Sequence, residues 1–348
     1  MDALIDSLLP LYARERAAGR PVALAVVVKT AGSTYSKWGT PLLLAQNGEY
    51  AGLLSGGCLE GDLREHAQQV IADGSARLFS YDMRGPDDTL YGLGAGCEGA
   101  MDIFMMQVGP MNGWQPLCAF EVALTAHCPT AVGLVIESKG ANPLSGEVLL
   151  PAAAAAFEAG LTEAARTGTP AWLSQTPQLR VFALPLTLPP RILLLGAGPD
   201  VCPVLEFAVL MGWKVTIYDH RAALATSGRL PGAEQVLLGR PESLAERLTL
   251  NSFDAAVVMS HHLHSDAAYL RVLAHSTIGY VGLLGPAPRR ERLLADVGAD
   301  FALLQHRLHA PIGLPLGGRS SAAIALSIVA EIHSWLQQCA DRSLAESR

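Results

Sequence analysis

Lysine is scarce in this 348-residue chain: only Lys29, Lys37, Lys139 and Lys214 occur among its 25 basic residues, and the rest are arginine. With 32 acidic residues, the formal net charge is −7. Proteins that bind nucleic acids generally carry an excess of positive charge instead. The charge balance therefore argues against nucleic acid as a partner.

Long hydrophobic runs are also missing. Half of the residues are hydrophobic and only 16% are charged, yet no stretch approaches the ~18–20 unbroken apolar residues that cross a bilayer. Pure apolar runs such as Val22–Val28 have the length of buried strands. The first twenty residues contain early acidic side chains and lack the apolar core of a signal peptide. We therefore expect a cytoplasmic protein with no membrane partner.

Cysteines are few and irregularly spaced. The six lie at positions 58, 97, 118, 128, 202 and 339, and no CxxC pair occurs. This spacing excludes a disulfide framework and gives no support to a structural zinc site. We expect the cysteines at 118, 128, 202 and 339 to be small buried residues. Cys58 and Cys97 differ, because they lie in glycine-rich segments.

The composition excludes disorder for the bulk of the chain, and its length predicts two domains. The first part combines helices with short strands, which is typical of an α+β domain. Three prolines within Leu184–Pro190 predict a linker, so we place one domain at residues 1–186 and the other at 187–348. Besides a helix in the first twenty residues, the predicted elements of the first part are strands Val22–Val28, Pro41–Ala45, Tyr50–Leu54, Ala76–Tyr81, Met101–Val108, Ala131–Glu137 and Val181–Leu184, and helices Leu59–Ala72 and Ala152–Arg166.

The second part alternates short apolar runs with helical patterns. Strands buried on both faces with helices between them indicate an α/β fold with a doubly wound parallel sheet, as in a Rossmann domain. A long amphipathic helix, Ser320–Gln338, closes the chain, and together with the apolar composition it favours a homodimer. The predicted strands are Ile192–Leu195, Val215–Tyr218, Gln235–Leu238, Ala255–Met259 and Ile278–Leu284.

The segment GAGPDV at residues 196–201 directly follows the first of these strands. Glycines here allow a tight strand-to-helix turn and bring backbone amides close to a phosphate at the helix N-terminus. The next strand ends in Asp219, where an acidic side chain would meet ribose hydroxyls. Because Val201 replaces the third glycine of GxGxxG, two interpretations stay open. Either Gly196, Gly198 and Asp219 bind a nucleotide, or the turn is an inherited scaffold whose site has changed its use.

The segment SGGCLEGD at residues 55–62 places Gly56 and Gly57 before a cysteine at a predicted helix start. Backbone amides and the helix dipole would favour the thiolate of Cys58. That thiolate could be a nucleophile, a sulfur carrier or a ligand of a soft metal. The alternative is a cysteine that is merely packed. Glu60 and Asp62 oppose its ionisation from one turn away.

Three further segments are candidates for ligand contact. The loop GSTYSK contains Ser33, Thr34 and Lys37, which could cradle an anion or belong to an ordinary polar loop. The segment GLGAGC ends at Cys97, and its glycines suggest close approach of the backbone to a ligand. The segment SHHLHSD contains His261 and follows the fourth Rossmann strand, at the edge where such sheets bind ligands. Its histidines could bind metal, transfer protons or be structural.

Taken in order, these segments resemble the XdhC/CoxI family, the accessory factors for xanthine dehydrogenase and related molybdenum hydroxylases. GSTYSKWGT, LLSGGCLEGDL and GLGAGCEG are similar to the family's N-terminal signature. LLLGAGPDVCPVLEFAVLMGWKVTIYDHR, MSHHLHSDAAYL, YVGLLG and LHAPIGLPLGGRSSAAIALSIVAEI are similar to its Rossmann part. The family usually has Cys-Gly-Gly where this chain has Cys97-Glu98-Gly99, and it often has proline where Tyr35 stands.

The resemblance implies a chaperone rather than a catalyst. Such proteins bind the molybdenum cofactor, either as molybdopterin or as its cytosine dinucleotide form. They hold it while a cysteine desulfurase supplies its terminal sulfido ligand, and then insert it into an apo molybdenum hydroxylase. For the dinucleotide form, a molybdopterin cytidylyltransferase is a further implied partner. The residues expected to contact this cofactor are Ser33, Thr34, Lys37, Gly56, Gly57, Cys58, Glu60, Cys97, Gly196, Gly198, Asp219 and His261. The resemblance also makes Cys58 a candidate ligand of the molybdenum.

The alternative function is that of an NAD(P)-dependent oxidoreductase. It would use Gly196, Gly198 and Asp219 to hold the nucleotide. Against this function, the sequence offers no convincing set of proton donors beyond His261.

Overall fold

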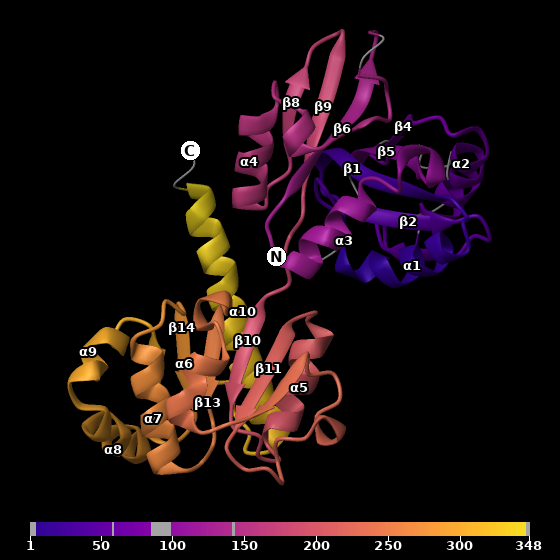
Figure 1. The fold of residues 1–348 in the computed structure, drawn as a ribbon. Helices are drawn as coiled ribbons and strands as arrows, with labels where there is room; N and C mark the ends of the chain where they lie inside the picture. The colour runs from indigo at the N-terminus through magenta and orange to yellow at the C-terminus, as the bar shows by residue number, and fades with distance from the viewer. Residues whose placement is uncertain (1–4, 58, 85–98, 141–142, 346–348) are drawn as a thin grey trace. The chain divides into compact units, whose positions relative to one another are not determined.

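The computed structural model describes residues 5–57, 59–84, 99–140 and 143–345. It divides into two compact units, Ala3–Leu188 and Pro189–Arg348. The boundary therefore lies two residues beyond the one predicted from the proline-rich linker. Each unit is described separately below (Figure 1).

The N-terminal unit contains an antiparallel sheet of order β3-β2-β1-β5-β4. Its central strand begins with Val22–Val28, and all seven of these side chains are buried. One face carries Ala23, Ala25 and Val27, which pack with the apolar side of α2 (Glu60–Asp73). The other face packs with α1 (Leu9–Ala17) and α3 (Leu117–Ala126). The strands are β1 (Val22–Gly32), β2 (Pro41–Ala45), β3 (Tyr50–Gly52), β4 (Arg77–Asp82) and β5 (Gly99–Val108).

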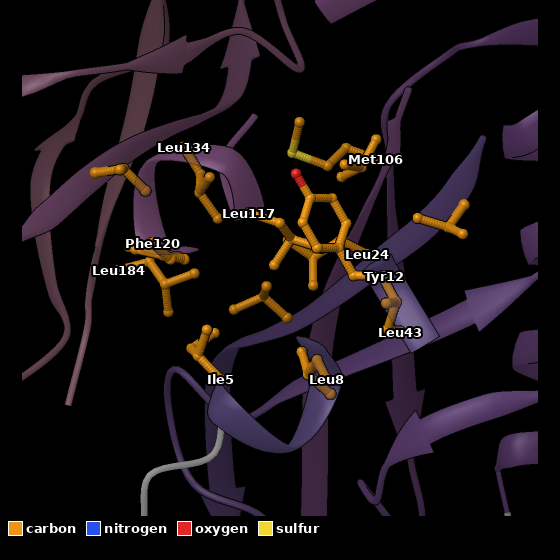
Figure 2. Close-up of a cluster of buried hydrophobic side chains, with 14 of the residues drawn as sticks. Ile5, Leu8, Tyr12, Leu24, Leu43, Met106, Leu117, Phe120, Leu134 and Leu184 are labelled. Carbon is orange, nitrogen blue, oxygen red and sulfur yellow. The ribbon is translucent and has the colours of Figure 1, made fainter. Parts of the chain in front are cut away.

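A second antiparallel sheet, of order β7-β6-β9-β8, completes this unit. Side chains from both sheets and from α1 and α3 meet in one core, where the ring of Tyr12 lies beside Leu24 and Met106 (Figure 2). The four strands are β6 (Ala131–Ser138), β7 (Val148–Leu149), β8 (Ala171–Gln175) and β9 (Leu179–Pro185).

The alanine-rich helix of the N-terminal unit begins later than predicted. The expected span was Ala152–Arg166, whereas α4 covers Glu158–Thr167, and Pro151–Ala153 forms only a short 3-10 turn. Ala154 leaves helical geometry, with φ −119° and ψ 54°, and is buried in the small core formed by α4, β6 and β9. Tertiary packing therefore overrides the high helix propensity of alanine.

The C-terminal unit is a six-stranded sheet of order β12-β11-β10-β13-β14-β15, and every neighbouring pair is parallel. This is the Rossmann strand order, and it confirms the predicted fold class. The strand order reverses between β10 and β13, which are neighbours in the sheet. The strands are β10 (Arg191–Leu195), β11 (Lys214–Asp219), β12 (Gln235–Leu238), β13 (Ala255–Val258), β14 (Tyr280–Leu283) and the unpredicted β15 (Leu308–His309).

Helices cover both faces of this parallel sheet. On one face, α5 (Val201–Leu210) and α10 (Ser321–Ala345) pack with Ile192 and Leu194 of the first strand. On the other face, α7 (Leu263–Ala274) and α8 (Ala287–Val297) pack with Leu193 and Leu195. Two short helices, α6 (Leu244–Arg247) and α9 (Phe301–Leu304), complete the unit. Alternate side chains of one strand thus supply both cores, as expected for a central strand.

Two features predicted from the sequence are the lack of a membrane-spanning segment and the burial of four cysteines. No helix within the described residues is long and apolar enough to cross a membrane. Cys118 and Cys202 are partly buried, but Cys128 and Cys339 are exposed. The expectation that all four are buried is therefore wrong for the last two.

Candidate functional site

The first candidate site is built from the loops that follow β1 and β3. Thr34 and Ser36 are buried in the first of these loops. The hydroxyl of Thr34 donates to the carbonyl of Ser36 at 2.8 Å, and the hydroxyl of Ser36 donates to the carbonyl of Leu53 at 3.3 Å. These two hydroxyls hold the loop together, whereas Ser33 and Lys37 are exposed. Of the predicted anion-contacting residues in this loop, Ser33 and Lys37 are thus the accessible ones.

The second loop is organised around the carboxylate of Glu60, which is 3% exposed. Its oxygens accept from the backbone amides of Leu54, Ser55 and Gly57 at 2.9–3.0 Å, and from the hydroxyl of Ser55 at 2.5 Å. Burial alone would raise the pKa of Glu60, but the hydrogen bonds from Ser55 and the loop amides outweigh it and lower that pKa. The chain's own carboxylate therefore occupies this cradle of amides.

This arrangement corrects one expectation about the segment around Cys58. The segment was expected to offer backbone amides to the thiolate of its cysteine. The amides of Leu54, Ser55 and Gly57 donate to Glu60 instead. Glu60 is thus an internal anchor of the loop. Asp62 has a separate partner, because it accepts from the hydroxyl of Tyr81 at 2.5 Å.

The structure brings the N-terminal signature segments together. Ser36 connects the first loop to Leu53, which precedes the loop held by Glu60. Gly99, at the start of β5, lies so close to the backbone of Ser33 that a Cβ atom would overlap it. Three segments far apart in the sequence therefore meet at one end of the β1–β5 pair. Cys58 and Cys97 belong to these segments but lie outside the described residues.

The second candidate site lies at the carboxyl ends of the strands in the parallel sheet, where the strand order reverses. Gly196 follows β10 with φ +130°, and a Cβ atom there would lie 2.6 Å from the carbonyl oxygen of Met259. Only glycine permits this close approach of the turn to the end of β13. No acceptor for the backbone N–H groups of Gly198 and Asp200 is found among the described residues. Gly198 is buried and Asp200 is partly exposed, and unpaired amides at the start of a helix are donors that a phosphate can accept.

Asp219 ends β11 and is fully buried. One carboxylate oxygen accepts from the amide of Ala197 at 2.6 Å, and both accept from the guanidinium of Arg221 at 2.6 and 2.9 Å. Burial would raise the pKa of Asp219, but hydrogen bonds from Arg221 and Ala197 outweigh it and lower that pKa. The carboxylate thus holds the glycine turn in place through the amide of Ala197. A ribose hydroxyl that bound Asp219 would have to share these oxygens with Ala197 and Arg221.

His261 lies at the same edge of the sheet, beside the glycine turn. Its Nε2 is 2.6 Å from Oδ2 of Asp200, and its backbone is in the left-handed region at φ +63°. The side chain of His261 is 56% exposed and that of Asp200 is 25% exposed. Asp200 belongs to the segment GAGPDV, but it was not predicted as a site residue. The sequence does not show that its side chain faces His261.

The remaining polar residues of the SHHLHSD segment have structural partners. Asp266 is fully buried and accepts from the hydroxyl of Ser260 at 2.5 Å and from Arg289 at 2.6 Å. His262 accepts from the amide of Ser265 and caps α7. Within the described ranges, no group of three or more histidine, cysteine or carboxylate side chains is placed to hold a metal ion. The possibility of a metal site in this histidine cluster is thus not supported.

A pocket of about 430 Å³ occurs elsewhere in the C-terminal unit. It is lined by Ala245–Asn251, which precede β13, and by His275 and Ser276, which precede β14. It therefore lies at the amino ends of the strands, opposite the edge at which sheets of this class bind ligands. We accordingly place the candidate site at the glycine turn.

Comparison with known proteins identifies the family. The XdhC and CoxI family pattern matches residues 15–82, and the XdhC Rossmann domain matches residues 192–332. A Bacillus subtilis (strain 168) protein named as a probable xanthine dehydrogenase subunit is 32% identical over 314 residues, which cover 89% of this chain and 91% of that protein. The chain belongs to the XdhC/CoxI family.

Two further proteins are similar to this chain. A crystal structure described as a xanthine dehydrogenase from Bacillus halodurans superposes with a TM-score of 0.75 and 26% identity, covering 97% of this chain and 96% of that one. The uncharacterized protein YqeB of Escherichia coli (strain K12) is 25% identical over 146 residues, which cover 41% of this chain and 27% of that protein. The match to the Bacillus halodurans structure therefore covers both units of this chain.

The candidate residues fall into the two matched ranges. The range 15–82 contains Ser33, Thr34, Lys37, Gly56, Gly57, Cys58 and Glu60, and the range 192–332 contains Gly196, Gly198, Asp219 and His261. Cys97 lies between them. Arg221 and Arg289, which pair with the buried aspartates at the carboxyl edge of the sheet, were missed. Each of these arginines follows a predicted strand within a few residues, and this position was the signal that could have identified it as a site residue.

Proposed function

We propose that this XdhC/CoxI family member is an accessory chaperone of a xanthine dehydrogenase or aldehyde oxidase type of molybdenum hydroxylase. In this proposal it binds the molybdenum cofactor as cargo, holds it during sulfuration by a cysteine desulfurase and inserts it into the apo-hydroxylase. One observation carries the proposal: similarity over 91% of the length of a relative named as a probable subunit of xanthine dehydrogenase. Intrinsic catalysis is not part of it.

The residues of both candidate sites suit an anionic cargo. The cofactor is a pterin phosphate, and in its dinucleotide form it also carries a pyrophosphate. The free amides of Gly198 and Asp200 at the start of α5 can bind phosphate oxygens. In the N-terminal unit, Ser33 and Lys37 are accessible beside the loop that Glu60 holds. These donor groups support the proposal that the protein carries a phosphorylated pterin.

Cys58 is the thiol that we propose for cofactor or sulfur handling. The preceding residue, Gly57, has φ +109° and donates its amide to Glu60, so the chain entering position 58 is anchored by a buried carboxylate. In this proposal the sulfur of Cys58 is a candidate ligand of the molybdenum or a carrier of the sulfur atom. Cys97 is the second candidate, with the carboxylate of Glu98 next to it.

The test is to purify the protein from a molybdenum-replete host, release any bound pterin by denaturation, oxidise it and measure its fluorescence. We expect a pterin in stoichiometric amounts, and higher activity of a partner apo-hydroxylase when the loaded protein is added. Cys58→Ser should fold normally but deliver less sulfurated cofactor, whereas Cys118→Ser, in α3, should behave as the wild type. Absence of pterin together with no activation of the hydroxylase would refute the proposal.

The alternative is an NAD(P)-dependent oxidoreductase. The Rossmann strand order and Gly196 favour it, but Asp219 already accepts from Ala197 and Arg221 rather than presenting a free acceptor to a ribose. The His261–Asp200 pair is an acid–base pair that this function could use. Reduction of NAD⁺ or NADP⁺ that depends on an added small-molecule alcohol as hydride donor, and that is lost in His261→Ala, would favour the oxidoreductase.

A further inference from the structure

We propose that Asp200 makes the glycine turn at residues 196–201 selective for pyrophosphate diesters, such as dinucleotides, over nucleoside diphosphates and triphosphates. This inference rests on the proposed function, in that it assigns the nucleotide half of the cargo to the glycine turn. The side chain of Asp200 is acidic, yet it lies where an anionic ligand is expected to bind.

The position of Asp200 follows from two measurements. Its Oδ1 would lie 2.7 Å from a Cβ atom built on Gly198, so the carboxylate lies directly over the second glycine of the turn. Its Oδ2 is 2.6 Å from Nε2 of His261, at the end of β13. The carboxylate therefore lies between the two segments that border the turn, beside the free amides of Gly198 and Asp200.

A fixed negative charge at this point acts on each phosphate according to the charge that phosphate carries. A phosphate in a diester linkage has a single negative charge. A terminal phosphate monoester has about 1.5–2 negative charges at pH 7, because its second pKa is near 6. Nucleoside diphosphates and triphosphates have such a terminal group, and dinucleotides do not. Asp200 therefore repels the free nucleotides more strongly than the diester.

His261 moderates this repulsion without removing it. Its ring nitrogen binds Asp200, but its side chain is more than half exposed, so water weakens the pairing. The guanidinium groups of Arg221 and Arg289 at this edge of the sheet are already paired with buried aspartates. Neither guanidinium forms an ion pair with Asp200, so its carboxylate charge remains beside the amides of Gly198 and Asp200, which can still hold a ligand of low charge.

The experiment measures calorimetric dissociation constants of the full-length protein for three probes that share a base: CDP-glycerol, CDP and CTP. We expect the wild type to bind CDP-glycerol about tenfold more tightly than CDP, and CTP more weakly still. Asp200→Asn keeps the size of the side chain and removes its charge. It should bring all three constants within about twofold, by tightening CDP and CTP.

Two matched variants separate this role from a merely structural one. His261→Ala exposes the charge of Asp200, so it should keep or widen the preference for CDP-glycerol. Glu246→Gln removes a carboxylate at the opposite edge of the sheet, and should leave all three constants unchanged.

Three results would overturn the proposal: equal affinities in the wild type, an unchanged preference in Asp200→Asn, or no binding of any probe by any form. Pterin co-purification reports separately on the chaperone function. A bound pterin without probe selectivity would refute the role of Asp200 alone, and selectivity without pterin would refute the chaperone function alone.

Discussion

The buried carboxylate of Asp219 offers a direct test of how the glycine turn is held in place. Replacing it with alanine removes the acceptor of the Ala197 amide and the partner of the Arg221 guanidinium. Ala197 is 1% exposed, so its N–H group has no access to water. We expect Asp219→Ala to destabilise the C-terminal unit and to loosen residues 196–201.

The magnitude follows from these contacts. A buried amide left without an acceptor costs about 1–3 kcal/mol. Removing one partner of a buried ion pair costs about 3–5 kcal/mol, but the side chain of Arg221 is 35% exposed and can turn towards water. Because the two effects overlap, we expect a loss of about 3–4 kcal/mol in the free energy of unfolding. For a unit of this size that corresponds to a decrease of about 10 °C in Tm.

Differential scanning calorimetry of the full chain measures the overall effect, and hydrogen exchange of peptides covering 191–201 localises it. Asp219→Asn retains one oxygen acceptor and should lose about half as much stability. Glu234→Ala, which removes a partly exposed partner of Arg191, should cost at most ~1 kcal/mol. A Tm for Asp219→Ala within 2 °C of the control, with unchanged exchange at the turn, would refute this account of how the turn is held.

Three further predictions concern stability. Glu60→Ala should lower the free energy of unfolding by about 2–3 kcal/mol, because it leaves three loop amides without their acceptor. Glu49→Ala, which breaks an exposed ion pair, should leave the stability nearly unchanged in the same denaturation assay. The pKa values of Glu60 and Asp219 are both lowered, so their contribution is complete above the unfolded-state pKa of about 4 and is lost as the pH falls through the folded values. Tm measured from pH 7 to pH 3 should therefore fall less in Asp219→Asn than in the wild type, and equal falls would contradict this. Gly99→Ala should reduce soluble expression or Tm, because its methyl group overlaps the backbone of Ser33; a stable, unperturbed variant would show that this contact is loose.

The fold was predictable where local pattern determines structure. The run Val22–Val28 is buried along its whole length, and each apolar run of the second part became a strand of the parallel sheet. Periodicity was less informative at Ala152–Arg166, where the alanines favour a helix but packing against β6 and β9 delays it to Glu158. The two-residue strand β15 carries too little pattern to be recognised.

The segments that form the candidate site could be predicted from the sequence, but the contacts between them could not. Gly196 and His261 were identified from their places after strands, and the structure brings their segments together. The pairing of His261 with Asp200 joins residues 61 positions apart, and such a contact depends on the strand order and on the backbone of each turn. Similarly, nothing in SGGCLEGD shows that Glu60 turns back onto the amides before it.

A common feature links the glycine-rich turns of the two units: each has a carboxylate of the chain where an anion is expected. In the N-terminal unit Glu60 accepts from the loop amides, and in the C-terminal unit Asp200 lies over Gly198. Each carboxylate reduces the number of donors, or the positive potential, that remains for a bound phosphate. An enzyme that retains its cofactor gains from leaving every such donor free. A carrier has to release its cargo to an apo-hydroxylase, so moderate affinity at these turns agrees with the proposed function better than a permanently bound nucleotide does.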